Sequence, residues 1–168
     1  PSLQSQLDML EVNAKAPLWL AGELIPYLKS WGGAILNVAS LAGFQPTPYF
    51  ATYGGTKAFI VNWSLALAEE LRPHGIPVLT VCPGPVRTNF FRAAGFDSPP
   101  VTKWHGQTPA QVAEWSLNAL EKGRNLIITG WNNRLLTFFS SLVPRRFMGR
   151  VSAFVMKKMR MEQFKTKT

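Results

Sequence analysis

Short apolar runs alternate with longer helical segments along the first three quarters of the chain. The runs are rich in Val, Ile and Leu and are bounded by Gly or Pro, which is typical of buried strands. We expect strands at residues 34–38, 77–81 and 126–129, and helices at residues 3–28, 49–71 and 108–122. Strands that alternate with helices form parallel crossover units. The pattern therefore predicts an α/β fold with part of a doubly wound, Rossmann-like parallel sheet.

Two of the predicted helices carry unusual features. The helix at residues 49–71 is apolar almost all round in its middle, so we expect it to be buried on more than one side. The helix at residues 3–28 contains Pro17, which removes a backbone donor and should bend the helix close to Asn13. The first feature predicts a partner for the outer side of the second helix, and the second predicts an irregular turn around Asn13.

Charge divides the chain into two parts. Residues 1–131 hold nine Lys or Arg and eight Asp or Glu, a net charge of +1, whereas residues 132–168 hold nine Lys or Arg and one Glu, a net charge of +8. The sequence contains no nucleic-acid-binding motif, so the basic balance alone does not predict a nucleic-acid partner. We expect a catalytic α/β region at residues 1–131 and a basic amphipathic tail at residues 132–168.

The basic tail is open to two interpretations. After a break at Pro144, apolar residues recur at helical spacing, and the opposite side of that helix carries Arg146, Arg150, Lys157 and Arg160. Such a helix can lie on an anionic membrane surface. It can equally pack over the protein's own substrate pocket and leave its basic side in water. The single cysteine, Cys82, requires no oxidising compartment, and we expect a cytoplasmic protein, which would associate with a membrane through this tail under the first interpretation.

Tyr53 and Lys57 lie four residues apart in a predicted helix, so their side chains share one side of it. A cation beside a phenol favours the phenolate and should lower the pKa of Tyr53 toward neutrality. Such a phenol can donate and accept a proton in catalysis. Ser40, at the end of the predicted strand 34–38, adds a hydroxyl thirteen residues before Tyr53. The two His residues do not cluster with carboxylates or cysteine, so we expect no metal site.

The spacing of Asn13, Ser40, Tyr53 and Lys57, together with the segment Pro83-Gly84-Pro85-Val86-Arg87-Thr88, resembles that of the short-chain dehydrogenase/reductase family. The resemblance implies that Tyr53 is the proton donor, that Ser40 binds the substrate oxygen and that Asn13 holds a relay water. It also implies that Tyr53 and Lys57 contact an NAD or NADP cofactor. The same cofactor would be held by the turn residues Pro83, Gly84, Val86 and Thr88.

One family feature is missing from the sequence. Family members open with a strand and a glycine-rich TGxxxGxG turn, whose helix N-terminus binds the cofactor pyrophosphate, and this chain has no such turn. We therefore expect a partial sheet that lacks the first four strands, and a chain that is inactive alone. The alternatives are a non-catalytic homologue that serves as a binding or oligomerisation module, and a membrane-surface adaptor that acts through the tail.

The substrate class is predicted from aromatic residues after the second strand. Phe90, Phe91, Phe96 and Trp104 suggest an apolar lid over the site. Such a lid suits a small carbonyl or alcohol compound that is apolar and lipid-like. The family resemblance implies in addition a homo-oligomer in which the helix at residues 49–71 meets its copy in a second subunit.

Overall fold

A three-stranded parallel sheet forms the centre of the protein. The computed structural model describes residues 2–93 and 106–165, with the side chains of residue 91 and of residues 158–165 excepted. The strands are β1 (Ile35–Val38), β2 (Val78–Cys82) and β3 (Leu126–Ile128), in the order β1-β2-β3. β2 pairs in parallel with both neighbours. The predicted α/β fold with parallel strands is confirmed, and each strand lies within one residue of its expected bounds.

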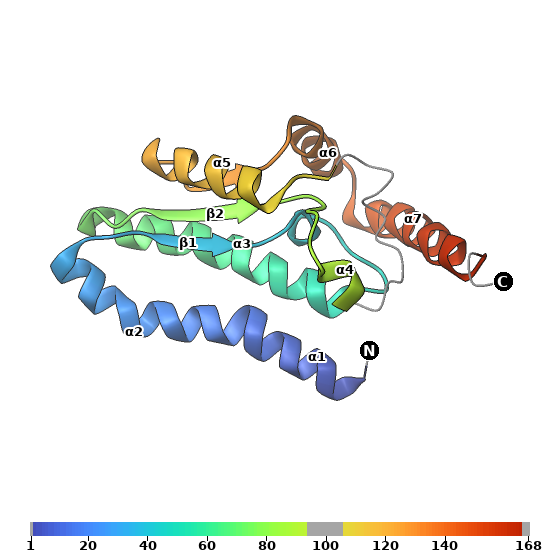
Figure 1. Ribbon diagram of the computed structural model, residues 1–168, viewed down its shortest axis with the longest axis horizontal. Helices are drawn as coiled ribbons and strands as arrows, with labels where there is room; N and C mark the ends of the chain where they lie inside the picture. Colours follow the sequence, from blue (N-terminus) through green and yellow to red (C-terminus); the bar gives the residue numbers. More distant parts are fainter. Residues whose placement is uncertain (1, 94–105, 166–168) are drawn as a thin grey trace.

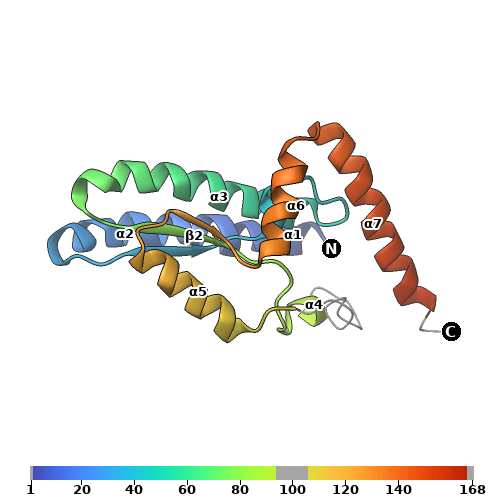
Figure 2. The same cartoon turned by 90° about the horizontal axis from the view of Figure 1, so that it is seen from above.

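Helices cover both faces of this sheet. Figures 1 and 2 show α3 and the rod of α1 and α2 on one side and α5 on the other, with α6 and α7 beyond one end of the strands. The helices are α1 (Leu3–Leu10), α2 (Ala16–Trp31), α3 (Ala51–Leu71), α4 (Phe90–Ala93), α5 (Pro109–Glu121), α6 (Trp131–Ser141) and α7 (Arg145–Lys165). α5 starts at a capping box of Thr108 and Gln111, as the Thr-Pro pair at its start predicts.

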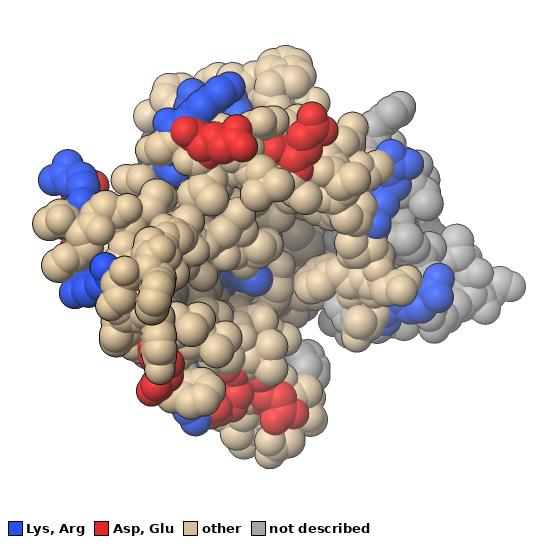
Figure 3. Space-filling model, turned by 60° about the vertical axis from the view of Figure 1, so that its left-hand side comes forward, with Lys and Arg blue, Asp and Glu red and all other residues tan. Residues whose placement is uncertain are grey.

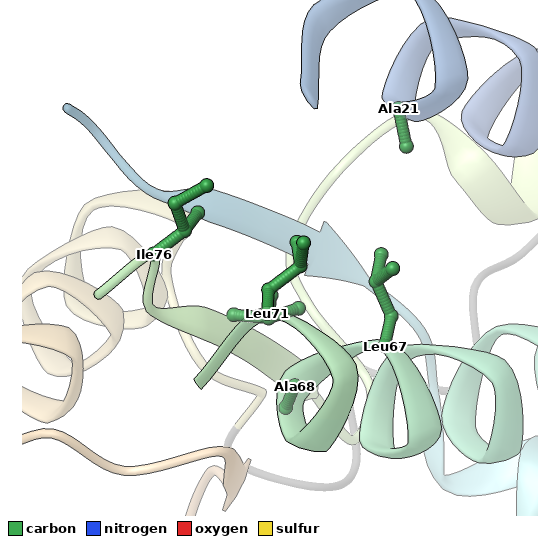
Figure 4. Close-up of a cluster of buried hydrophobic side chains, with 6 residues drawn as sticks. Ala21, Leu67, Ala68, Leu71 and Ile76 are labelled. Carbon is green, nitrogen blue, oxygen red and sulfur yellow. The ribbon is translucent and has the colours of Figure 1, made fainter. Parts of the chain in front are cut away.

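β2 is buried on both faces because successive side chains of a strand point to opposite sides. Leu79 and Val81 pack with Ala119 of α5 and Ile127 of β3, whereas Val78 and Cys82 belong to clusters on the α3 side. In Figure 4, side chains from α2, α3 and the approach to β2 converge in the first of these clusters. The labelled members are Ala21, Leu67, Ala68, Leu71 and Ile76. This core fixes α3 against the sheet, and α3 carries two of the predicted catalytic residues.

The predicted bend in the first helix takes the form of a π-helical turn. Residues Glu11–Lys15 form this turn between α1 and α2, and it contains Asn13. Pro17 follows within the first turn of α2 and has no N–H to offer to the carbonyl of Asn13. The chain passes from α1 to α2 without a break, because the wider π-helical turn accommodates the hydrogen bond that Pro17 cannot make.

α3 is buried along its length, as its apolar middle predicts. One side of α3 is buried from end to end against the sheet and α2. Its buried residues are Gly54, Thr56, Ile60, Val61, Ser64, Leu67, Ala68 and Leu71. Phe59 and Trp63 stack with ring centroids 5.9 Å apart, and Phe59 remains exposed on the outer side. Among the described residues, β1 pairs only with β2, so its other edge is open and Val38 is exposed beside it.

Candidate active site

The predicted catalytic residues meet at the carboxyl end of β1. Ser40 follows this strand and caps the short 3-10 turn Leu41–Gly43, where its Oγ accepts a hydrogen bond from the N–H of Ala42 at 3.2 Å. This turn packs against α3 so closely that a Cβ added to Gly43 would lie 2.8 Å from the carbonyl oxygen of Lys57. Glycine therefore permits the approach that brings Ser40 to the first turns of α3, which carry Tyr53 and Lys57.

A hydrogen bond joins the side chains of Ser40 and Tyr53. Burial raises the pKa of the Tyr53 phenol above its ordinary value, and the bond from Ser40 acts in the opposite direction with a smaller effect. Burial disfavours the charged phenolate and outweighs the effect of this bond. The phenol consequently stays protonated at neutral pH, as a proton donor must.

Lys57 extends its ammonium beneath the Tyr53 ring. The Nζ atom lies 5.8 Å from the ring centroid and donates a hydrogen bond of 2.9 Å to the carbonyl of Val38 at the end of β1. Burial lowers the pKa of Lys57. The Val38 carbonyl holds the ammonium in place, so the fixed cation next to Tyr53 that the sequence predicts is present.

One electrostatic expectation differs from the structure. We expected Lys57 to lower the pKa of Tyr53, but that pKa is raised because removal of the phenol from water is the largest influence on it. Desolvation disfavours the charged phenolate. Lys57 lies near the ring, with its Nζ atom 5.8 Å from the centroid, but burial of the phenol outweighs any lowering of the Tyr53 pKa by this cation.

Asn13 reaches the site through a residue that the sequence analysis missed. Its Nδ2 donates to Oγ1 of Thr56 at 3.3 Å, and Oγ1 of Thr56 donates to the carbonyl oxygen of Tyr53 at 2.7 Å. Thr56 is buried. A hydroxyl three residues after Tyr53 on the same helix was the available signal. The contact ties the π-helical turn to the part of α3 that carries the phenol.

The predicted cofactor turn lies next to the Ser40 turn. The N–H of Leu41 donates to the carbonyl of Pro83 at 3.1 Å, which brings the two strand ends together. Gly84 lies so close to Asn133 that a Cβ added to the glycine would collide with the side-chain amide of Asn133. Thr88 caps α4, where its Oγ1 accepts from the N–H of Phe90 at 3.2 Å.

Two polar residues outside the predicted set support this turn. Val86 pairs with Gln107 in an isolated parallel bridge, and the side chain of Gln107 accepts a hydrogen bond from Thr129. Asn133 donates to the carbonyl of Thr129 at 2.7 Å. Gln107 and Asn133 are far from the turn in sequence, and no local pattern marks them. Only the fold brings them beneath Gly84 and Val86.

The apolar lid is partly described. Phe90 lies over the phenol of Tyr53, with ring centroids 5.3 Å apart and planes inclined by 46°. The side chain of Phe91 and the whole of Phe96 and Trp104 lie outside the described residues. Phe90 therefore covers one side of the proton donor with apolar surface, as the sequence predicts for the first of these aromatics.

Cys82 at the end of β2 lies under the same site and is fully buried. Burial raises the pKa of its thiol from 9.0 to about 12, although the backbone N–H of Ser40 and the charge of Lys57 act to lower it. Because the unfolded thiol ionises first as the pH rises, the free energy of unfolding should fall by about 1 kcal/mol per pH unit above about pH 9. In Cys82→Ala this contribution disappears.

Urea unfolding of both proteins between about pH 8 and about pH 11 measures the effect as a difference in slope. The cavity cost of the substitution lowers stability at every pH and leaves the slope untouched. Parallel pH profiles for Cys82→Ala and the unmodified chain would show that the thiol does not resist ionisation in the folded state.

Comparisons with known proteins agree with this arrangement. The profile of the short chain dehydrogenase family matches residues 2–97. A very-long-chain 3-oxoacyl-CoA reductase of Pyrenophora tritici-repentis is 44% identical over 79 residues, which are 46% of this chain and 23% of that protein. The human dehydrogenase/reductase SDR family member 4 is 35% identical over 89 residues, covering 52% of this chain and 32% of that protein.

Solved structures of the same kind superimpose on the fold. A short-chain dehydrogenase from Burkholderia cenocepacia in complex with NADP has a TM-score of 0.74 at 26% identity, over 90% of this chain and 60% of that one. One from Sphingobium yanoikuyae in complex with NADPH has a TM-score of 0.71 at 28% identity, over 84% and 56%. The chain thus spans a quarter to a third of these sequence relatives and somewhat more than half of these structures.

Proposed function

Because the chain belongs to the short-chain dehydrogenase family, we propose that it supplies the catalytic residues of an NAD(P)-dependent oxidoreductase. The reaction is reduction of a carbonyl or oxidation of an alcohol on an apolar, lipid-like substrate. The observation that carries the proposal is the hydrogen bond between the side chains of Ser40 and Tyr53, beside the ammonium of Lys57. A proton donor, an oxygen-binding hydroxyl and a fixed cation are what carbonyl reduction requires of a protein.

Proton transfer falls to Tyr53. A bound nicotinamide supplies or receives the hydride, and the protein directs it. As negative charge develops on the substrate oxygen, the phenol of Tyr53 gives its proton to that oxygen, and Ser40 donates a hydrogen bond to it. The phenolate that remains is stabilised by the Lys57 ammonium, which lies 5.8 Å from the centre of the ring. In the reverse direction the same groups accept the proton of an alcohol.

The residues that would hold the nicotinamide lie around the same strand ends. Pro83, Gly84 and Val86 form a half-buried turn after β2, and this turn is hydrogen-bonded to the turn of Ser40. A side chain at Gly84 would collide with the Asn133 side chain as it stands. Thr88 is exposed at the mouth of the turn. Backbone groups of this turn, Thr88 and Lys57 fit an amide and a ribose, with NAD and NADP both acceptable.

Asn13 and Thr56 position the phenol from behind. Their two hydrogen bonds hold the backbone carbonyl of Tyr53 relative to the π-helical turn. The backbone carbonyl of Asn13 lacks its usual helical donor, because the residue four positions later is Pro17, which has no N–H. We assign that carbonyl to a water that returns protons to the site, in line with the family resemblance.

The apolar substrate class rests on Phe90 and on the names of relatives. Phe90 lies directly on the ring of Tyr53, and the Pyrenophora relative is a very-long-chain 3-oxoacyl-CoA reductase. We expect kcat/KM to rise along a series of methyl ketones of increasing chain length, by up to about threefold for each added CH₂ that is buried. The measurement is ketone-dependent oxidation of NADPH and NADH by a polypeptide that contains this chain and binds the cofactor. A flat series would contradict the apolar pocket.

A second, compatible role as an oligomerisation module is favoured by exposed apolar side chains on two helices. α2 exposes Trp19, Leu24 and Tyr27, and α3 exposes Phe59. We propose that α2 and α3 meet their copies in a homo-oligomer. Sedimentation equilibrium of the chain should give a mass above that of a monomer, and Trp19→Ser should lower the association constant about tenfold or more. Leu117→Ser on α5 is the matched control, and a strictly monomeric chain would contradict the role.

A further inference from the structure

α6 has its polar side turned toward the protein and its apolar side turned toward solvent. The half-buried positions of α6 are Asn133, Thr137 and Ser140. Their side chains bond to backbone carbonyls of Thr129, Asn133 and Thr137. Apart from Asn132 and Arg134, the exposed positions up to Phe139 are large and apolar, with Trp131 70% and Phe138 58% accessible. A surface helix of a soluble protein has the opposite arrangement, so the outer side of α6 calls for an apolar partner.

α7 also exposes large apolar residues, but its inner side differs from that of α6. On that inner side Ser152 is buried, Gly149 lies beside Pro46, and Met148 and Met156 are half-buried. The exposed positions include Phe154, which is 73% accessible. A helix is present in the tail, as predicted, and among the described residues Val151, Phe154 and Val155 of this helix are exposed. The exposed apolar residues of both helices, here called the α6–α7 face, are Trp131, Leu135, Leu136, Phe138, Phe139, Leu142, Phe147, Val151, Phe154 and Val155.

Basic side chains border the α6–α7 face. At 100° per residue, Arg146, Arg150 and Lys157 of α7 share a narrow strip next to Phe154 and Phe147. Residues 132–157 contain five Lys or Arg and no Asp or Glu. In Figure 3 the described residues toward the right-hand side of the view include Lys and Arg, whereas the visible Asp and Glu of the described residues lie elsewhere. A partner for this face must accept apolar side chains and positive charge together.

We propose that the α6–α7 face docks the protein on a membrane surface rich in acidic phospholipid. Acidic headgroups attract basic side chains, and the acyl boundary takes up apolar ones. Trp131 suits the headgroup boundary, where tryptophan is enriched. Among the described helices none is long and apolar enough to cross a bilayer, so the contact is interfacial. Two copies packed through this face would bring the same Arg and Lys strips together, which opposes self-association.

The proposal goes beyond the redox reaction and does not depend on it. Docking through α6 and α7 would hold the carboxyl ends of the strands, where Tyr53 lies, near the lipid surface. Its test therefore uses lipid binding alone and needs neither cofactor nor substrate.

Flotation with vesicles measures the contact. The chain should float with vesicles of phosphatidylcholine and phosphatidylserine in equal amounts and should bind pure phosphatidylcholine at least about tenfold more weakly. Raising the salt concentration should weaken the first binding, because salt screens exposed charges. Absence of binding to the mixed vesicles, or equal binding to both kinds, would overturn the proposal.

Matched variants separate the apolar and the charged contributions. Phe138→Ser and Phe154→Ser should each weaken binding about tenfold or more, whereas Leu117→Ser, which removes a 57% accessible side chain of α5, should leave it unchanged. Arg146→Gln combined with Arg150→Gln should weaken binding about thirtyfold, and Lys29→Gln combined with Lys122→Gln should not. Circular dichroism confirms that each variant is folded.

Two outcomes would assign the face to another partner and overturn the proposal. In the first, Phe138→Ser and Phe154→Ser bind the mixed vesicles as well as the unmodified chain does. In the second, the unmodified chain self-associates in sedimentation and both variants are monomeric with vesicle binding unchanged, which would make the face a contact between copies.

Discussion

Tyr53→Phe should reduce the rate of ketone reduction by about 10²–10⁴, the usual cost of losing a general acid, while cofactor binding survives. The substitution keeps the ring that packs against Phe90 and removes only the hydroxyl that Ser40 contacts. Burial raises the pKa of this phenol, so it is protonated at neutral pH and can donate its proton. Steady-state kcat/KM for a long-chain ketone and NADPH titration by fluorescence give the two quantities.

Tyr27→Phe is the matched control for this substitution. Tyr27 lies on α2 and is 66% accessible, so its hydroxyl should affect neither rate nor affinity. A Tyr53→Phe protein that keeps more than about a tenth of the unmodified rate would have lost less than a general acid contributes. The assignment of Tyr53 as proton donor would then be wrong.

Lys57→Met should lower the rate and the cofactor affinity together. The ammonium stabilises the Tyr53 phenolate, and removing one such group typically costs about 10²–10³ in rate. It would also donate to the cofactor ribose, and loss of a charged hydrogen bond should weaken NADPH binding about tenfold or more. Methionine keeps the length and the apolar stem of the side chain, so packing on α3 should change little.

The comparison of Lys57→Met with Lys122→Met separates a local effect from a general loss of positive charge. Lys122 is exposed at the end of α5, and its substitution should change neither quantity. Because Tyr53 and Lys57 act as one unit, the double substitution should cost little more than Tyr53→Phe alone. Costs that add in full would show that the two residues act independently.

The sequence predicted the elements of this fold closely because the signals were local. Buried strands, the Thr108-Pro109 helix start and the break at Pro144 each depend on neighbouring residues. The same holds for Tyr53 and Lys57, since residues four apart on a helix share a side. The form of the bend at Asn13 was not predictable, because either a kink or a π-helical turn can accommodate the missing N–H of Pro17.

Properties that depend on tertiary contacts were missed. The raised pKa of Tyr53 follows from how deeply the fold buries it, and sequence spacing contains no measure of burial. Thr56, Gln107 and Asn133 support the site only after α3, the turn at Val86 and α6 have come together. The outward apolar side of α6 is also invisible in the sequence, since periodicity defines two sides of a helix and not which of them faces the protein.

Transfer of deuterium from NADPH labelled at the reactive carbon of the nicotinamide tests the central claim most directly. The protein used is a polypeptide that contains this chain and binds the cofactor, with a long-chain ketone as substrate. The account predicts an alcohol that carries deuterium on its carbinol carbon, and loss of this product in Tyr53→Phe. An unlabelled alcohol, no alcohol at all, or a labelled alcohol formed equally well by Tyr53→Phe would contradict it.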